Sequence, residues 1–334
     1  MRIKRKSENW FPLIYRYNKE KCMSKEGNGK RYHSLNYFLR NKFGGKIFKI
    51  SLDGGFTCPN RDGKVAFGGC TFCSSKGSGD YAGSRALSIS KQFEDQKEMM
   101  QKKWKDGKYI AYFQAYTNTY APVEVLREKY EDALKQENVV GLSIGTRADC
   151  LEEDVLDLLE EINKKTYLSV ELGLQTINDE SARNFNRGYD FEVFKEGIKK
   201  LQDRGIEVVV HTIFGLPGET KKDMLKTIEY VANSGAQGIK FHLLHLMEGT
   251  KMVEQYEKGE MELLSQEDYI DLICKGIAMI PEKMVVHRLT GDAPRQSLIG
   301  PMWSLKKWEV LNAIDKALVD NDMWQGKDYK PRNI

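Results

Sequence analysis

Three of the six cysteines lie in one short stretch of the chain, residues 52–75. Eleven residues separate Cys58 from Cys70, and Cys70 and Cys73 form a Cys-x-x-Cys pair directly after two glycines. A buried structural cysteine usually lies in an apolar run, whereas these three lie among Gly, Pro, Asn, Asp and Lys. Because glycine lets the backbone turn tightly, the three thiolates can converge on one point. The pattern predicts a metal site.

Three converging thiolates suit two kinds of metal centre. One is an iron–sulfur cluster with one open iron, and the other is a zinc ion completed by a fourth ligand. A disulfide would pair two of the thiols and leave the third alone, so the spacing favours metal strongly over a disulfide or inert thiols. It favours the iron–sulfur cluster over zinc only modestly.

The composition is that of a soluble globular protein. Charged residues make up 30% and apolar residues 40% of the 334 positions, and the net charge of +4 is too mild to indicate nucleic-acid binding by itself. No apolar run is long enough to cross a membrane, and the basic N-terminus lacks the features of a signal peptide. With the clustered thiols, this favours a reducing cytoplasm. Met23 offers a second start, which makes residues 1–22 a candidate translational extension.

Strands and helices are expected to alternate along most of the chain. The hydrophobic periodicity predicts strands at 46–52, 109–115, 139–145, 168–174, 207–214 and 238–246. It predicts helices at 34–43, 89–106, 122–137, 152–164, 191–204, 220–233, 266–278 and 305–319. Six strand–helix units imply a parallel sheet with right-handed crossovers. No dinucleotide fingerprint or Walker loop is present, so we expect a closed or nearly closed α/β barrel.

Polar residues follow each predicted strand, at the barrel end where active sites gather. They are the cysteines after the first strand, Tyr116, Thr117, Asn118 and Thr119 after the second, Arg147, Asp149 and Cys150 after the third, Glu171 and Gln175 on the fourth, residues 215–219 after the fifth, and His242, His245 and Glu248 on the sixth. The sequence therefore predicts that these groups converge where the metal would lie.

Several of these residues keep two interpretations. Cys150 is a candidate hydrogen-atom donor or covalent partner to substrate, or an inert loop thiol. His242 and His245 are three apart, so on one strand they would point to opposite faces and only one would line the barrel. His211 is expected to hydrogen-bond within the core or barrel. Cys274 lies in an apolar helix and is expected in the core.

The sequence resembles the radical S-adenosylmethionine (SAM) enzymes, and among them the YhcC/YtqA-type branch related to the catalytic subunit of Elongator. The resemblance spans residues 31–325 and rests on ISLDGGFTCPNRDG, GGCTFCS, YFQAYTNTYAP, GTRADC, ELGLQTIND, HTIFGLPGET and HRLTGDAPR. Two departures are the eleven residues between the first two cysteines, where most radical SAM enzymes have three, and Ala148, where the branch usually has proline. The second should alter loop stiffness and not chemistry.

The resemblance implies both the cofactors and their chemistry. Cys58, Cys70 and Cys73 would hold three irons of a [4Fe–4S] cluster, and SAM would chelate the fourth. One electron would break the C5′–S bond of SAM, and the 5′-deoxyadenosyl radical would take a hydrogen atom from the substrate. The fold would be a partial (β/α)6, TIM-like barrel with an N-terminal arm and a C-terminal extension.

The resemblance also assigns further site residues. Cofactor-binding residues would be Phe72 by the adenine, Tyr116, Thr117 and Asn118 by the SAM amino group, Glu171 and Gln175 by the ribose or amino acid end, Arg187 by the carboxylate, and Gly215 and Pro217 in a turn against the adenine. Catalytic candidates beyond the cluster are Cys150 and His245.

The segment 287–295 carries two arginines, an acid and a histidine among turn residues. It could cap the barrel, or it could recognise a phosphate or another anion through Arg288 and Arg295, and both roles can hold together. We therefore expect a flexible arm over 1–30, a barrel over 31–280, and a capping and substrate segment over 281–334.

The resemblance suggests a tRNA substrate, modified at the C5 substituent of the wobble uridine. The expected reaction converts 5-carboxymethylaminomethyluridine to 5-aminomethyluridine. We expect no acetyltransferase domain after the barrel, which argues against acetyl-CoA-dependent carboxymethylation. Expected partners are tRNA, a reductant such as flavodoxin or ferredoxin, and a downstream methyltransferase, with no membrane involved. The alternatives are radical chemistry on a small metabolite or protein, and a zinc-stabilised barrel that binds RNA or protein without catalysis.

Overall fold

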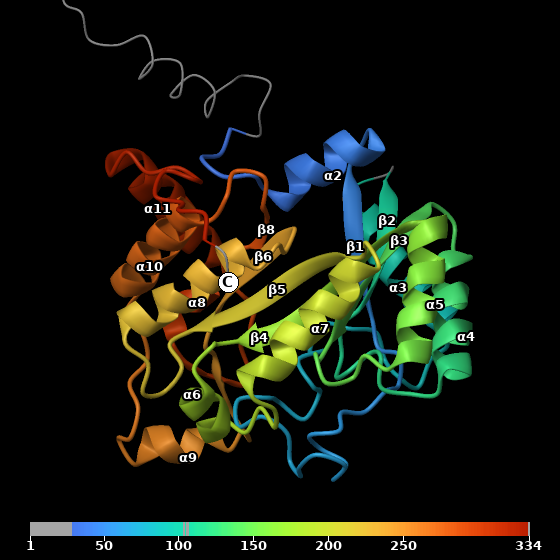
Figure 1. Cartoon of the computed structure of the whole chain (residues 1–334), viewed down its shortest axis with the longest axis horizontal. Helices are drawn as coiled ribbons and strands as arrows, with labels where there is room; N and C mark the ends of the chain where they lie inside the picture. The colour runs from blue at the N-terminus through green and yellow to red at the C-terminus, as the bar shows by residue number, and fades with distance from the viewer. Residues whose placement is uncertain (1–28, 103, 105–106, 333–334) are drawn as a thin grey trace, which may run out of the picture.

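The computed structural model describes residues 29–102, 104 and 107–332 (Figure 1). The predicted N-terminal arm therefore lies almost wholly outside the described residues. The possible translational extension, and with it the sixth cysteine, Cys22, lies entirely outside them. Within the described part of the chain, no helix is long and apolar enough to span a membrane.

Seven parallel strands form one curved sheet in the order β1-β2-β3-β4-β5-β6-β8. Their bounds are β1 Ile47–Leu52, β2 Lys108–Phe113, β3 Val139–Thr146, β4 Tyr167–Gln175, β5 Glu207–Phe214, β6 Gly238–Leu243 and β8 Val285–Arg288. The order ends at β1 and β8, which do not pair with each other, so the barrel is partial. The expected α/β, TIM-like partial barrel is confirmed.

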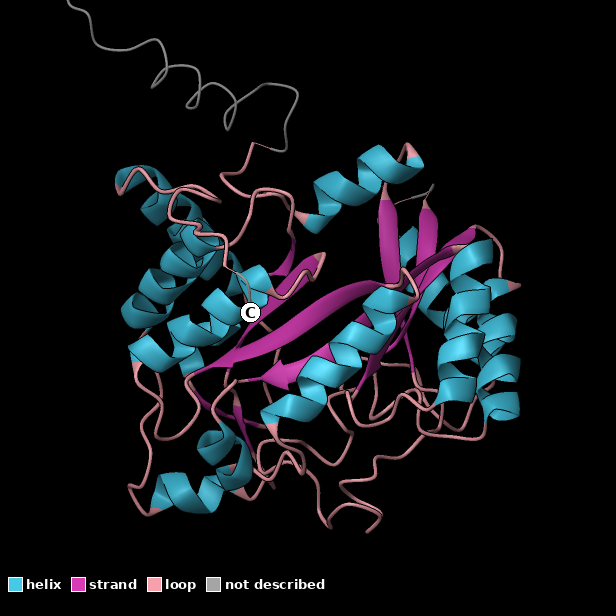
Figure 2. Ribbon diagram, viewed as in Figure 1, coloured by secondary structure: helices cyan, strands magenta, loops and turns pink. Residues whose placement is uncertain are grey.

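Helices cover the outer side of this sheet, except for α2 Leu35–Phe43, which lies across one end of it (Figure 2). The others are α3 Ile89–Gln101, α4 Val123–Leu134, α5 Glu153–Lys165, α7 Phe191–Asp203, α8 Lys221–Asn233, α10 Gln266–Met279 and α11 Lys307–Asp320. Shorter elements are α6 Asp179–Asn184, α9 Met252–Glu257, a 3-10 turn Met302–Leu305, and the antiparallel pair β7 Leu246–Met247 and β9 Leu298–Gly300. The residues next to a helix start can specify it, as at the start of α8. There the Thr220 side chain accepts from the backbone N–H of Asp223, and the Asp223 carboxylate accepts from the backbone N–H of Thr220.

Each strand sorts its side chains between two environments. In β4, Leu168, Val170 and Leu172 face the apolar core beneath the helices. Because side chains alternate along a strand, Ser169 and Glu171 face the barrel interior, where both are buried. The outer layer is thus apolar, and the interior is polar.

The seventh strand was not expected. β8 comes from the predicted C-terminal segment and pairs with β6 in parallel, with Lys240 opposite Arg288. The helix α2 packs against both edge strands, β1 and β8, and Val286 donates its backbone N–H to His33 O at 2.8 Å. The predicted sixth strand is also too long, because β6 ends at Leu243 and not at residue 246.

Candidate active site

A cavity of about 290 Å³ opens among the loops that follow the strands. All three clustered cysteines line it. So do these residues predicted from the sequence: Phe72, Tyr116, Thr117, Glu171, Gln175, Arg187, His242, His245 and Arg288. Most of the predicted convergence of polar groups is therefore present.

The cysteine loop is built from successive tight turns and not from helix or strand. Arg61 N–H donates to Cys58 O at 2.8 Å, and Cys73 N–H donates to Cys70 O at 2.9 Å. Gly69 has a φ of +79°, and a Cβ there would lie 2.8 Å from the side chain of Arg61. A larger residue at this position would be strained in backbone and in space. The glycine therefore allows the loop to bring its thiols to the cavity.

The loop is tied to the chain that follows α6. Asn60 Nδ2 donates to Asn186 O at 2.5 Å, and Asn186 Nδ2 donates to Gly69 O at 2.9 Å. Phe72 packs on the ring of Phe185, with 5.3 Å between centroids, and also lines the cavity. These long-range contacts hold the loop in place without using the thiols.

The donor set fits an iron–sulfur cluster. Cys58, Cys70 and Cys73 are free thiols facing one cavity. The pKa of Cys73 is lowered to about 6 by a hydrogen bond from Cys70, then by Ser78 and the charge of Arg61. A lowered pKa favours the thiolate, which is the form that binds iron. The described residues hold no group of three or more His, Cys, Asp or Glu side chains arranged for a single metal ion.

The predicted SAM contacts after β2 divide between the cavity and the core. Tyr116 and Thr117 line the cavity, and the Tyr116 hydroxyl donates to Ser75 O at 2.5 Å. Asn118 is fully buried, and its Nδ2 donates to Gly145 O at 2.8 Å. Asn118 therefore braces the turn behind the cavity through Nδ2, whereas its buried Oδ1 has no partner among the described residues, and its contact with the SAM amino group stays a prediction.

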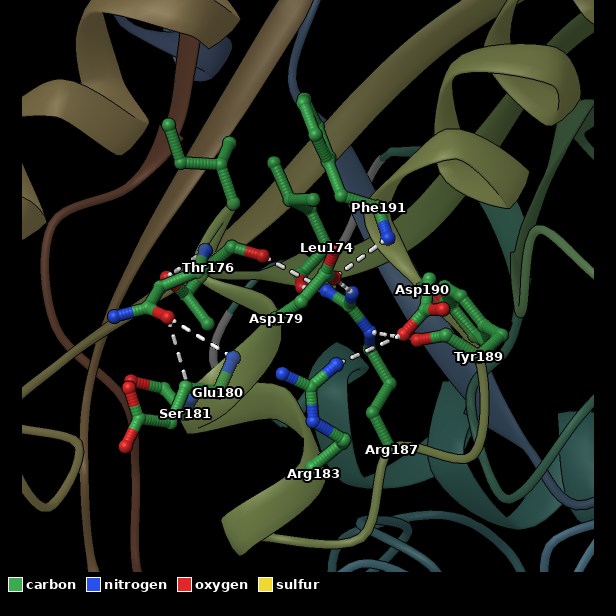
Figure 3. A network of polar contacts seen from close by, with 12 residues as sticks. Leu174, Thr176, Asp179, Glu180, Ser181, Arg183, Arg187, Tyr189, Asp190 and Phe191 are labelled. Atoms are coloured by element: carbon green, nitrogen blue, oxygen red, sulfur yellow. Dashed lines mark hydrogen bonds and ion pairs between the residues drawn. The ribbon is translucent and has the colours of Figure 1, made fainter.

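Arg187 has a structural role that the sequence did not suggest (Figure 3). Its Nη1 donates to the carbonyls of Leu174 at 2.9 Å and Thr176 at 2.8 Å, and its Nε donates to Tyr189 O at 2.9 Å. Its Nη2 pairs with Asp179 at 3.0 Å, and the side chain is 1% exposed. The guanidinium is engaged in joining the end of β4 to the loop after α6. Arg187 also lines the cavity, and its contact with the SAM carboxylate stays a prediction.

Glu171 is the centre of a buried ion-pair network. Its carboxylate contacts Lys49 Nζ at 2.7 Å, His211 Nε2 at 2.8 Å and the ammonium of Lys240. The Ser143 hydroxyl donates to it at 2.8 Å. Burial raises the pKa of Glu171, but the charges of Lys240 and Lys49 outweigh this and hold it well below its usual value. A carboxylate so fully engaged does not support the predicted role in binding the SAM ribose or amino acid end.

Both His242 and His245 line the cavity, so the expectation that only one would do so is wrong. The two-residue alternation ends with β6 at Leu243, before His245 is reached. Burial lowers the pKa of His211 and of His245 to about 4. Both imidazoles are therefore neutral at pH 7.

Besides Asn118, four predicted site residues do not line the cavity. Cys150 is 2% exposed and burial raises its pKa, so its thiol is neither accessible nor ionised. A Cβ on Gly215 would meet Leu264 at 3.2 Å, so this position lies against an apolar side chain, and Pro217 is outside the cavity lining. Arg295 is exposed on the surface. These positions differ from the expected catalytic, adenine-binding and anion-binding roles.

The sequence prediction missed Lys49 and Lys240 altogether. Both are charged residues at inward positions of otherwise apolar strands, IFKISL and GIKFHL. That pattern was a usable signal, because a buried lysine almost always has an acidic partner. It did not identify the partner.

Comparison with known proteins agrees with this site. The profile of the Radical SAM superfamily matches residues 58–231, and that of the Radical_SAM C-terminal domain matches residues 236–320. The protein YtqA of Bacillus subtilis is 58% identical over 301 residues, which cover 90% of this chain and 94% of YtqA. Protein YhcC of Escherichia coli is 40% identical over 281 residues, which cover 84% of this chain and 90% of YhcC.

The fold is similar to that of a solved archaeal Elp3, from Methanocaldococcus infernus. The TM-score is 0.64 at 16% sequence identity, and the match covers 84% of this chain and 64% of that chain. Three thiols at the cavity, the partial barrel and the matched profiles agree with one another. The chain therefore belongs to the radical SAM superfamily, which uses a [4Fe–4S] cluster and SAM, and within it to the family of YtqA and YhcC.

Proposed function

We propose that this chain modifies the wobble uridine of a tRNA at its C5 substituent, converting 5-carboxymethylaminomethyluridine to 5-aminomethyluridine. The observation that carries the proposal is that one cavity joins the three thiols to Arg288 of the seventh strand. A reaction that starts near the cluster can therefore reach a substrate held by the C-terminal segment. The choice of tRNA is supported by the motifs shared with the branch related to Elongator.

Residues at different places along the cavity have different roles. Cys58, Cys70 and Cys73 would hold the cluster, and Tyr116 and Gln175 line the space beside it where SAM would lie. When bound, the cluster and SAM supply a radical that removes one hydrogen atom from the substrate. The loop 291–294 lines the cavity from the C-terminal segment and would exclude water from it.

The proposed reaction balances without another oxidant. The carboxymethyl CH2 loses a hydrogen atom and an electron, both of which SAM takes up as it is cleaved. Water then adds to the resulting carbon–nitrogen double bond and supplies the oxygen of glyoxylate, which leaves. The aminomethyl group stays on the base.

The test is an anaerobic assay of the reconstituted protein with dithionite, SAM and tRNA that carries 5-carboxymethylaminomethyluridine. We expect tRNA-dependent 5′-deoxyadenosine, conversion of the wobble nucleoside by mass spectrometry, and release of glyoxylate. A Cys58/Cys70/Cys73→Ala triple variant is the control. SAM cleavage stimulated by a metabolite pool but not by tRNA would contradict the proposal and favour the small-metabolite alternative.

The surroundings of the reaction follow from this proposal. It would take place in the cytoplasm, with electrons from a flavodoxin or ferredoxin. The primary amine of the product would be a substrate for a downstream methyltransferase. Because the net charge is only +4, tRNA would be held by local basic surfaces.

A further inference from the structure

One end of the cavity carries more positive than negative charge. We call it the cationic corner and define it by Lys240, His242 and Arg288, all of which line the cavity. Lys240 and Arg288 are register partners on the neighbouring strands β6 and β8. Because partners on adjacent strands share a face of the sheet, their side chains point into the same space.

The acids near the corner leave an excess of positive charge. Glu171 pairs with Lys49 and Lys240. Both carboxylate oxygens of Asp292 accept hydrogen bonds from Lys307 Nζ at 2.7 Å. Asp292 Oδ2 lies 3.7 Å from Arg288 Nη2. Two carboxylates thus face four basic side chains, so basic groups outnumber acids near the corner. The remaining acid of the lining, Asp80, is hydrogen-bonded to Ser74 in the cysteine loop.

The least compensated of these cations is Arg288. The distance of 3.7 Å to Asp292 exceeds that of a hydrogen bond, because Lys307 occupies the carboxylate. The Arg288 side chain is 34% exposed, so solvent or a ligand in the cavity can reach it. Its planar fork of N–H groups matches a carboxylate with two parallel hydrogen bonds.

The corner also offers an unused polar group. His242 Nε2 is buried and has no hydrogen-bond partner. Burial, together with the charges of Arg288 and Lys240 and the neighbouring His211, holds the pKa of His242 well below its usual value. The pKa of Lys240 is lowered to about 7 by burial and by the charges of Lys49 and Arg288, against the opposing effect of Glu171. An entering anion would relieve this positive potential.

We propose that the cationic corner binds the carboxylate of the substrate, with Arg288 as its main ligand, and so distinguishes the carboxymethylated base from the aminomethyl product. The inference rests on the proposed function. SAM also carries a carboxylate, but SAM would lie at the cluster, at the part of the cavity lined by Cys73 and Arg61, whose Nη2 donates to Cys73 O at 3.2 Å. The substrate carboxylate is therefore the one assigned to the corner. Its loss in the reaction would weaken binding and help the product to leave.

The test uses the reconstituted, SAM-loaded protein and two free nucleosides, 5-carboxymethylaminomethyluridine and 5-aminomethyluridine. Equilibrium titration should show that the wild-type protein prefers the carboxylated nucleoside by about 10- to 100-fold, as for a charge-assisted pair of hydrogen bonds. Arg288→Gln should abolish this preference, and Arg288→Lys should keep only part of it because lysine lacks the fork. SAM affinity is measured in parallel in both variants, so that a change in nucleoside preference can be separated from a change in SAM binding.

Arg295→Gln is the matched control, because it removes the same charge from the same segment at an exposed position outside the cavity lining. It should retain the wild-type preference. An Arg288→Gln variant that still prefers the carboxylated nucleoside, or one that loses SAM affinity instead, would overturn the assignment. These results are distinct from failure of the proposed function, which would show as a wild-type protein that converts no wobble nucleoside in tRNA.

Discussion

The cysteine loop and the Glu171 network lie on the same cavity but are stabilised in opposite ways. The loop, residues 52–75, is held by backbone turns and by amide contacts such as that between Asn60 and Asn186. Its thiols take little part in these contacts. In the Glu171 network, by contrast, the carboxylate is already fully paired, because four side chains from other strands contact it.

The difference shows how one protein separates cofactor loading from fold stability. Ligands of a cluster must stay available until the cluster arrives, so their removal should leave the folded chain intact. A buried carboxylate must be compensated at once, because an unpaired charge in the interior is costly. Substitutions in the two regions should therefore affect different measurements.

The largest effect is expected from the thiols. Cys58→Ala, Cys70→Ala or Cys73→Ala should each reduce SAM cleavage to background, because three thiolates are needed to hold the cluster. Thermal melting of the cluster-free variants should match that of the cluster-free wild type. Cys150→Ala should retain SAM cleavage, since this thiol lies outside the cavity lining. Iron content and 5′-deoxyadenosine yield measure both, and loss of cleavage in Cys150→Ala would contradict the geometry.

The second effect concerns stability. Glu171→Gln should lower the free energy of unfolding by about 3–5 kcal/mol, because Lys49 and Lys240 would remain buried without a countercharge. Urea unfolding of the cluster-free protein measures this. Adding Lys240→Met should recover part of the loss. Glu161→Gln is the control, because Glu161 also pairs with two cations, Arg127 and Lys165, but at an exposed site, and should show no measurable change.

The third prediction concerns the contribution of Arg187 to stability. Arg187→Met should lower the free energy of unfolding by about 3 kcal/mol, because it leaves the buried carbonyl of Thr176 without a donor and removes a second donor from Leu174 O. Arg183→Met is a matched control, since Arg183 is exposed and has one long contact, at 3.4 Å to Asp190. If Arg187→Met were as stable as wild type but bound SAM weakly, the residue would be a cofactor ligand after all.

The smallest effect is a pH dependence. Burial lowers the pKa of His211 and His245 to about 4, below the usual value of about 6.5. Between these values the unfolded chain binds protons that the folded chain does not, so stability falls as pH falls. Each histidine contributes up to about 1.4 kcal/mol per pH unit in this window. His245→Gln should flatten the stability profile between pH 6.5 and 4, and an unchanged profile would contradict the burial of His245.

The local patterns of the chain were sufficient for the main architecture. The predicted strand 207–214 coincides with β5 Glu207–Phe214, and the predicted helix 266–278 nearly coincides with α10 Gln266–Met279. These segments have strong periodicity and clear helix starts, so neighbouring residues alone specify them. The spacing of the three cysteines was informative for the same reason. All three lie within one loop, and convergence needs only tight turns.

Local sequence patterns could not predict strand β8, nor the surroundings of Glu171, Arg187 and Arg295. β8 is four residues long, and it is a strand because the edge of β6 is available to pair with it. Lys49 and Glu171 are 122 positions apart and meet only through the register of three strand pairings, β1 with β2, β2 with β3 and β3 with β4. The predicted pair Arg288 and Arg295 separates because the chain turns away from the cavity after residue 294.

Residue types and their spacing were enough to predict the candidate cluster ligands, the parallel barrel and the end of the barrel where the site lies. Each of these depends on residue type and spacing within one segment or on one repeated pattern. Which charged groups are already paired, and which remain open to a ligand, depends on the tertiary structure. Strand register and burial bring residues from distant segments into contact and set the cost of leaving any one of them without a partner.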